Sequence, residues 1–375
     1  MTLRYQLVLG VMIGSLVGTA NAFDLFGAIK EMATQSAGNT AKEAATQGVV
    51  NTVKGDTAPS AGNKTPEEAP ASKALTVTAI NPEDLSSYSN TVVVPTVYVK
   101  LLVQGSAFVS QQGGYQIGKS SNSVKASAKY KVVGIDKKLA QDIARRAYDD
   151  CVAKLRAAGY TVLTYNDIRE RDFVKTAERE KADASWGLPV ESSRNGDETY
   201  VVAAPSDEQM FVSGANGGVF NQFIHWGKPK FTDATIIIPQ YTITAPQVWG
   251  TKEASYSTIS AAIGTEPSMQ LRSAAAPWMG APVVRIMHGI PGVTTDGAIK
   301  TAQKVGELVK STDTTPESAN ALSKGLSMLT GSGSISQSSA EYTFTIDPSA
   351  YTSGAIKGAS DFNAHMAEVA VAAKK

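Results

Sequence analysis

The sequence predicts an α+β protein in which a mixed sheet is flanked by helices and preceded by a flexible leader. Some segments are rich in β-branched residues or alternate in polarity, as strands do, and others carry apolar residues at helical spacing. Predicted helices and strands alternate in parts of the chain while several predicted strands adjoin one another, which favours a mixed sheet. The apolar share, 42% of 375 residues, is sufficient for a core.

The amino terminus has the pattern of a secretory signal peptide, which we assign to residues 1–22. Arg4 supplies a positive charge, Leu7–Val17 is an apolar run too short to cross a bilayer, and Thr19–Ala22 ends in the small residues that signal peptidase recognises. The alternative is a buried amino-terminal helix. Cys151 is the single cysteine, so the exported fold has no internal disulfide. We expect export to the periplasm or the cell surface of a bacterium.

The next segment, residues 23–73, is predicted to be a short amphipathic segment followed by a disordered linker. Its first residues place apolar side chains on one face at helical spacing. These candidate partner-binding residues are Phe23, Leu25, Phe26, Ile29 and Met32. They fit a tether for a partner protein or a peripheral contact with a membrane, and they also fit a terminal helix packed on its own domain. The linker contains few large apolar residues, so it cannot bury enough surface to offset the entropy of ordering.

The α+β domain is predicted over residues 74–372, and its first clear elements are two strands. Thr91–Val103 is β-branched, with Pro95 marking an edge or a bend, and Val124–Val133 alternates like a half-exposed strand. Between them, Gly113–Ser120 matches the phosphate-binding loop of nucleotide hydrolases. That loop needs a helix after it to direct N–H groups at phosphate, whereas a strand pattern follows here. We therefore predict a hairpin connection at this position.

The segment Ile135–Ala158 is predicted to be a helix that Asp136 caps and Gly159 ends. Apolar residues spaced four apart define its buried stripe. The stripe consists of Leu139, Ile143, Ala147, Cys151 and Leu155. Because Cys151 lies in this stripe, we interpret it as a core thiol and not as a nucleophile.

The rest of the domain is predicted to continue this mixture, with a long insertion at about 181–230 and a flexible loop at about 311–339. The predicted strands are Tyr160–Tyr165, Asp233–Thr244 with a bulge or edge at Pro239, Pro282–Met287 and Glu341–Ile346. The predicted helices are Asn166–Ala184, Val219–His225, Thr294–Lys310 and Ser353–Ala372.

Composition and motifs identify no catalytic, cofactor-binding or metal-binding residues. The net charge of +1 gives no field that would attract nucleic acid. The three histidines, His225, His288 and His365, lie far apart without metal-ligand spacing. The tryptophans Trp226, Trp249 and Trp278 fit a binding groove or, more commonly, core packing. A Ser–His–Asp triad can still assemble from distant residues, so a secreted hydrolase is the alternative function.

Two segments resemble the superfamily that contains the curli secretion channel and the TolB amino-terminal domain. One is CVAKLRAAGY followed by TVLTYNDI, Cys151–Ile168, and the other is DATIIIPQYTI, Asp233–Ile243. The chain departs from that pattern in lacking a lipid-attachment cysteine and in the long insertion between Lys181 and Lys230. The resemblance implies a non-catalytic role in binding or assembly within the bacterial envelope.

We therefore expect an exported, non-enzymatic envelope or secretion-linked assembly protein. Its partners would be envelope or secretion-system proteins, with no cofactor and no nucleic acid. Docking would use sheet edges, exposed loops or the amino-terminal segment. The sequence leaves the oligomeric state open.

Overall fold

The computed structural model describes residues 51–54, 76–82, 89–112, 123–212, 223, 226, 230–231, 234–254, 259–279, 291–313 and 335–373. Contacts divide the chain into two units, Met1–Glu43 and Ala44–Lys375, and every described residue belongs to the second. The predicted signal peptide and the candidate residues Phe23, Leu25, Phe26, Ile29 and Met32 therefore lie outside the described residues.

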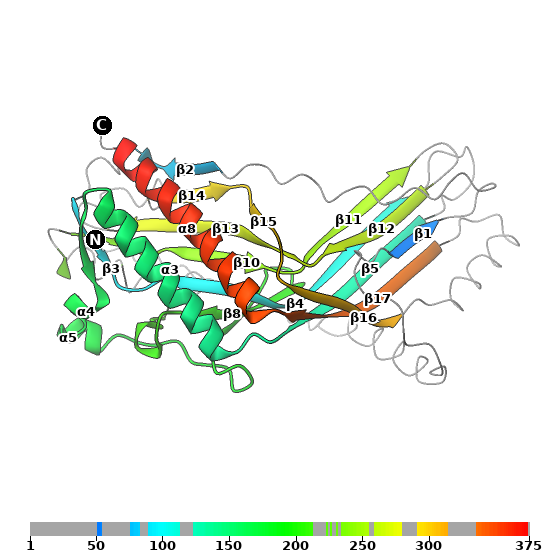
Figure 1. Cartoon of the computed structure of the whole chain (residues 1–375), viewed down its shortest axis with the longest axis horizontal. Coiled ribbons are helices and arrows are strands. Elements are labelled where there is room, and N and C mark those ends of the chain that lie inside the picture. Colours follow the sequence, from blue (N-terminus) through cyan, green and yellow to red (C-terminus); the bar gives the residue numbers. More distant parts are fainter. Residues whose placement is uncertain are drawn as a thin grey trace, which may run out of the picture. The chain divides into compact units, whose positions relative to one another are not determined.

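Figure 1 shows the helices and strands of the second unit. The helices of the described residues are α3 (Lys137–Ala157), α4 (Tyr165–Ile168), α5 (Asp172–Lys175) and α8 (Pro348–Ala372), with a 3-10 turn η1 (Asp207–Gln209). The strands are β1 (Asn51–Lys54), β2 (Thr76–Ile80), β3 (Thr91–Val94), β4 (Tyr98–Gln112), β5 (Ser123–Val133), β6 (Thr161–Thr164), β7 (Val190–Ser192), β8 (Glu198–Ala203), β9 (Thr235–Ile237), β10 (Gln240–Thr244), β11 (Gln247–Ala254), β12 (Ile259–Glu266), β13 (Ser268–Met279), β14 (Gly292–Asp296), β15 (Ile299–Lys304), β16 (Gly306–Asp313) and β17 (Ile335–Ile346).

The predicted α+β class with a mixed sheet is confirmed. Within the described residues, fourteen strands form one sheet whose main path runs β16-β17-β5-β4-β10-β13-β9-β3-β6. The pairs β10–β4, β17–β5, β3–β6 and β3–β9 are parallel, whereas β4 pairs antiparallel with both β5 and β8. A second sheet of the described residues contains β1, β12 and β11.

The helices α3 and α8 lie side by side against the sheet and bury the main core with it (Figure 1). The helix predicted at Ile135–Ala158 is confirmed as α3. The Asp136 carboxylate accepts a hydrogen bond from the Leu139 N–H at 2.7 Å, and Gly159 follows the helix with φ +90°. Cys151 is fully buried, and burial raises the pKa of its thiol, as expected for a core position.

A buried polar network fixes α8 against α3 and β10. The Tyr241 hydroxyl donates to Asn363 Oδ1 at 2.7 Å, and Asn363 Nδ2 donates to Asp150 Oδ2 at 2.9 Å. The Ser360 hydroxyl donates to the other Asp150 oxygen at 3.0 Å. Asn363 is fully buried, and both ends of its amide have partners. The network therefore favours one relative position of these three elements.

Alternation along the short central strands separates two cores. In β3, Val92 and Val94 belong to the core under α3 and α8, while Val93 belongs to a second core. In β9, Ile237 belongs to the core under α3 and α8, and Ile236 belongs to the second core. The second core is rich in aromatic residues that pack edge to face, and includes Tyr165, Phe173, Phe211, Phe223, Trp226 and Phe231.

The second half of β4 extends beyond the helices, where it belongs to a layer of four strands (Figure 1). There β4 pairs with β5, β5 with β17, and β17 with β16. The sheet of β1, β12 and β11 packs on one face of this layer. A third core, which we also call the small-residue core because alanine is its commonest residue, lies between them. It consists of Leu102, Val109, Val124, Ala126, Ala128, Tyr130, Tyr200, Ala261, Ile263, Ala340 and Tyr342.

Gly105 is required where Tyr130 crosses β4. The two residues are directly opposite in the β4–β5 register, and a Cβ at position 105 would lie 2.3 Å from the Tyr130 hydroxyl oxygen. Tyr130 is buried. Any larger residue at position 105 therefore displaces a ring that closes one end of the third core.

The helix predicted at Thr294–Lys310 is wrong. This segment contributes to β14, β15 and β16, which pair with β13, β2 and β17. Its apolar spacing fits a short helix, but its threonines and valines also suit a half-buried strand, and the cross-strand partners decide the outcome.

Several segments predicted to be irregular form strands. β7 and β8 lie inside the predicted insertion at 181–230, and β8 (ETYVVA) pairs with β4. β16 and β17 extend into the predicted loop at 311–339, and β1 lies within the predicted linker. Asn166–Ala184 is α4, α5 and a loop instead of one helix. In each case pairing with a distant strand, or packing of a short turn, overrides the local composition.

Other expectations are confirmed, one of them only in part. Pro95 lies in the break between β3 and β4, as a bend requires. The single strand predicted at Asp233–Thr244 is instead two strands, β9 and β10, and Pro239 lies in the break between them and not at a bulge or edge. The predicted strands Val124–Val133 and Tyr160–Tyr165 correspond to β5 and β6, and Glu341–Ile346 is the end of the longer β17. The closing helix is α8, which begins at Pro348 after the capping Asp347.

Three further expectations fall wholly or mostly outside the described residues. They are the phosphate-loop match Gly113–Ser120, the strand Pro282–Met287 and the helix Val219–His225. The strands on either side of the first, β4 and β5, pair antiparallel up to Gln112 opposite Ser123, as a hairpin requires. The helix that a phosphate-binding loop needs is replaced by β5.

The Gly105–Tyr130 contact predicts a specific double-mutant result. Gly105→Ala should destabilise the protein by about 1–3 kcal/mol, because the new methyl group displaces the Tyr130 ring. In a Tyr130→Ala background the same substitution should cost close to nothing. Chemical denaturation of the four proteins measures the coupling, and an equal cost in both backgrounds would contradict the steric explanation.

The α3–α8 network predicts that Asn363→Leu costs about 1–3 kcal/mol, because Tyr241 and Asp150 lose a buried partner. Tyr241→Phe, which removes one hydroxyl, should cost about 1 kcal/mol. Lys357→Ala, on the exposed side of the same helix, is the control and should change stability by less than about 0.5 kcal/mol. A loss for Asn363→Leu no larger than that of the control would refute the role of the network.

Candidate binding surfaces

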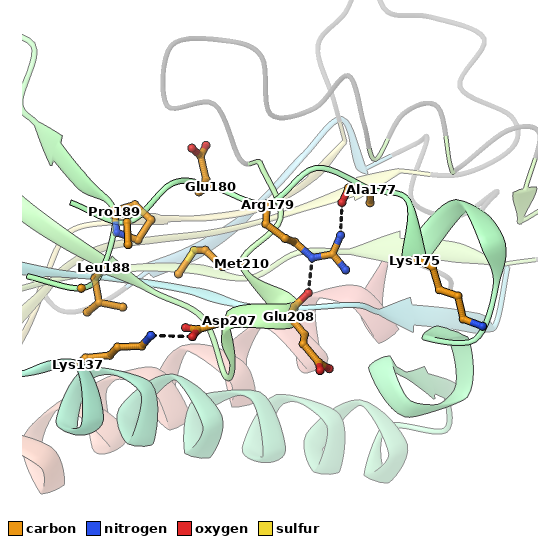
Figure 2. Close-up of a pocket in the computed structure, with 12 residues that line it drawn as sticks. Lys137, Lys175, Ala177, Arg179, Glu180, Leu188, Pro189, Asp207, Glu208 and Met210 are labelled. Carbon is orange, nitrogen blue, oxygen red and sulfur yellow. Dashed lines mark hydrogen bonds and ion pairs between the residues drawn. The ribbon is translucent and has the colours of Figure 1, made fainter. Parts of the chain in front are cut away.

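An open pocket of about 560 Å³ lies between the start of α3, α5, the loop after it and η1 (Figure 2). Its charged lining residues are Lys137, Lys175, Arg179, Glu180, Asp207 and Glu208. The Lys137 ammonium lies 2.6 Å from an Asp207 carboxylate oxygen, and the Lys175 ammonium lies 2.9 Å from Glu170. Tyr165 donates to Glu208 at 3.2 Å. Burial, with Glu208 beside it, raises the pKa of Tyr165, which keeps its phenol a donor.

Arg179 holds the wall of this pocket together. Its guanidinium donates to the Glu208 carbonyl at 2.6 Å, to the Val174 carbonyl at 3.2 Å and to the Ala177 carbonyl. It also lies over the Phe211 ring, 4.3 Å from the centroid, at the edge of the second core. A planar guanidinium with several donors suits such a set of carbonyls. Arg179 therefore acts as a structural link between the loop, η1 and the aromatic core.

Most of the charged side chains that line the pocket have partners. Lys137 and Lys175 pair with carboxylates, Arg179 donates to backbone carbonyls, and Glu208 accepts from Tyr165. No group of three or more potential metal ligands occurs among the residues that the structure describes.

Of the histidines and tryptophans that the sequence singled out, the structure describes His365, Trp226, Trp249 and Trp278. His365 lies exposed on α8, with its Nδ1 3.2 Å from Glu368, and His225 and His288 lie outside the described residues. Trp278 is fully buried and packs edge to face on Tyr160, and Trp226 lies in the aromatic core. The Trp249 ring lies against Gly264. Core and interior packing thus accounts for these tryptophans.

A different surface is formed by β4 where it extends beyond β8. The β4–β8 ladder ends at Gly105 opposite Glu198, and Ser106 N–H still donates to the Asp197 carbonyl at 2.8 Å. From Phe108 onward, β4 pairs with β5 on one edge, and no strand of the described residues pairs with the other. We call this the open edge of β4, residues 108–112. Phe108 is 65% exposed there, the largest exposed fraction among the exposed large apolar side chains of the described residues.

The outer face next to the open edge is polar and basic. Residues of β4, β5 and β17 alternate, so that one set faces the third core and the other faces outward. The outward set includes Ser106, Phe108 and Ser110 of β4; Lys125, Ser127, Lys129 and Lys131 of β5; and Ser339, Glu341 and Thr343 of β17. This face therefore combines one aromatic side chain with hydroxyls, ammonium groups and the carboxylate of Glu341, which lies opposite Lys129.

The sequence contained part of this signal. The alternation in VKASAKYKVV predicts a half-exposed strand, which is β5, and places its lysines on one face. The open edge was not predictable, because it depends on where the distant β8 stops pairing with β4. From the sequence alone, Phe108 cannot be distinguished from the other residues of its strand.

In the residues that the structure describes, no helix is long and apolar enough to span a membrane. Comparisons of the chain with protein-family models, with curated proteins and with solved structures found no match.

The role of Arg179 predicts that Arg179→Ala lowers stability by about 1.5–3 kcal/mol, because three carbonyls lose a charged donor. Arg179→Lys keeps the charge but cannot reproduce the fork of donors, so it should recover only part of the loss. Arg145→Ala, on the exposed side of α3, is the control. Thermal unfolding measures all three, and wild-type stability of Arg179→Lys would show that the fork is unimportant.

Proposed function

We propose that this protein is an exported, non-enzymatic assembly or binding protein of a bacterial envelope, and that it docks partners through the open edge of β4. The observation that carries the proposal is the open edge itself, where a strand ladder ends and Phe108 is exposed beside it. Natural edge strands are usually shielded by charges, prolines, bulges or a covering segment. An edge that no described segment shields, and that carries an exposed aromatic residue, is suited to strand addition.

Three further features support the proposal. The amino terminus has the signal-peptide pattern, and Cys151, the single cysteine, is a buried thiol. The segments Cys151–Ile168 and Asp233–Ile243, on which the resemblance to the curli channel and TolB superfamily rests, lie in α3, β6, α4, β9 and β10. An assembly role also agrees with the open pocket of about 560 Å³, whose charged lining could contact a partner. No observation on the described residues favours the alternative of a secreted hydrolase.

The proposal is tested by placing a photo-crosslinking amino acid at position 108 or at position 365 in cells that express the full chain. Phe108 and His365 are both exposed, but only the first lies at the open edge. Position 108 should form crosslinks to another envelope polypeptide, detected by mass spectrometry, and the crosslinked chain should begin at Phe23. Position 365 is the matched control. An absence of crosslinks at 108, or equal crosslinking at both positions, would overturn docking at this edge.

A further inference from the structure

We propose that the partner bound at the open edge of β4 is an acidic, extended polypeptide segment that adds to the sheet as a strand. This inference rests on the proposed function, since it names the chemistry of the partner at the same surface. It is carried by three properties of the described residues: the direction of the free backbone groups, the exposure of Phe108 and the charge of the β4–β5 hairpin.

The backbone of β4 presents hydrogen-bonding groups to the open edge. Ser106 N–H points toward β8, where it donates to Asp197. Alternate residues of a strand point their N–H and C=O groups the same way, so those of Phe108 and Ser110 point to the same side, beyond the end of β8. The groups of Val109 point the other way, into the ladder with β5. An added strand would thus continue the line of β8.

Side chains on the outer face can recognise such a strand. Phe108 would contact the residue opposite it, as cross-strand aromatic pairs do. Val109 faces the third core, beneath which β11 packs: a Cβ on Gly250 would come within 2.9 Å of it. One face of the added strand, on the side of Phe108, would therefore remain exposed. Its other face would lie on the side where β11 packs.

The lysine side chains of β5 are the reason why we expect the partner strand to carry acidic residues. Lys125 is directly opposite Ser110, and Lys129 is directly opposite Ser106. Because a serine is short, the long stem of Lys125 can extend across it toward a strand about 4.8 Å beyond β4. Within the described part of the chain no ion pair engages Lys125.

The charge of the whole hairpin points to the same partner. Residues 98–133 contain no aspartate or glutamate and five lysines, namely Lys100, Lys119, Lys125, Lys129 and Lys131. Lys100 pairs with Glu191 at 2.5 Å, Lys129 lies opposite Glu341 and Lys119 lies outside the described residues, so the positive charge available beside the open edge is that of Lys125. Acidic residues on the outer face of an added strand would meet this excess, and basic residues would be repelled. An anionic lipid surface would also attract the lysines, but it has no donors and acceptors in strand register for Phe108 and Ser110. Strand addition accounts both for the lysines and for the backbone groups of Phe108 and Ser110 that point to the open edge.

The test uses the full-length protein and a fluorescent peptide of about eight residues, an ordinary strand length, in which glutamate alternates with valine. Fluorescence anisotropy should detect binding that weakens as salt is raised from about 0.05 to 0.5 M. Three probes serve as comparisons: the same peptide with lysine for glutamate, peptides N-methylated at every second residue in either phase, and phosphatidylglycerol vesicles. The lysine peptide should not bind, and one phase of N-methylation should abolish binding because it removes the donors that face β4.

Two variants locate the site. Phe108→Asp and Lys125→Glu should each weaken binding of the acidic peptide by about tenfold or more, while Lys138→Glu, the same charge change at an exposed site on α3, should leave it unchanged. Both edge variants alter outward-facing residues of the β4–β5 layer, so melting temperatures near that of the wild type should confirm that they fold. Equal binding of acidic and lysine peptides, unchanged binding by the two edge variants, or binding of vesicles in place of peptide would overturn the proposal.

The two proposals fail differently. If position 108 forms crosslinks in cells but the acidic peptide does not bind, docking at this edge stands and the acidic partner is wrong. If the peptide binds with the expected dependence on Phe108 and Lys125 but no crosslink forms in cells, the recognition chemistry is supported and the cellular docking role is wrong.

Discussion

The structure depends on β4, because this strand contributes side chains to all three cores. Val99, Leu101 and Val103 belong to the core under α3 and α8, Tyr98 to the aromatic core, and Leu102 and Val109 to the small-residue core. Along its length β4 pairs with β10, β8 and β5, with a register shift near Leu102. A strand that must satisfy three environments leaves little freedom for the elements around it, and the end of β8 then determines where the open edge begins.

The sequence predicts well the elements whose signals are local. The cap at Asp136, the stop at Gly159 and the stripe through Cys151 are contained within one helix, and the alternation of β5 is contained within one strand. The sequence does not predict the elements that form only by pairing with distant strands. Thr294–Lys310 and the ETYVVA strand become part of the sheet because β13, β17 and β4 are available to pair with them, and nothing in their own composition identifies those partners.

The same reasoning applies to the candidate site. The lysines of β5 could be placed on one face from their spacing alone, and the absence of acidic residues from 98–133 is visible in the sequence. What makes them a candidate site is their position beside an edge that no described strand pairs with, and this follows only from the β4–β8 register. The open edge is not shielded by a charge of its own. Its lysines belong to the neighbouring strand and lie opposite serines of β4, so they would attract an acidic strand without blocking pairing.

The residues that stabilise the fold differ from those to which we assign docking. The helical part is held by a satisfied network at Asn363, and the pocket wall by the donors of Arg179, both away from the open edge. At the edge, Phe108 is exposed and contributes little to a core, and no strand of the described residues pairs with the backbone beside it. An added strand would form a ladder with that backbone and would cover Phe108, without any change in the three cores. A rigid fold with a free edge of this kind can bind a partner strand while its own structure stays the same.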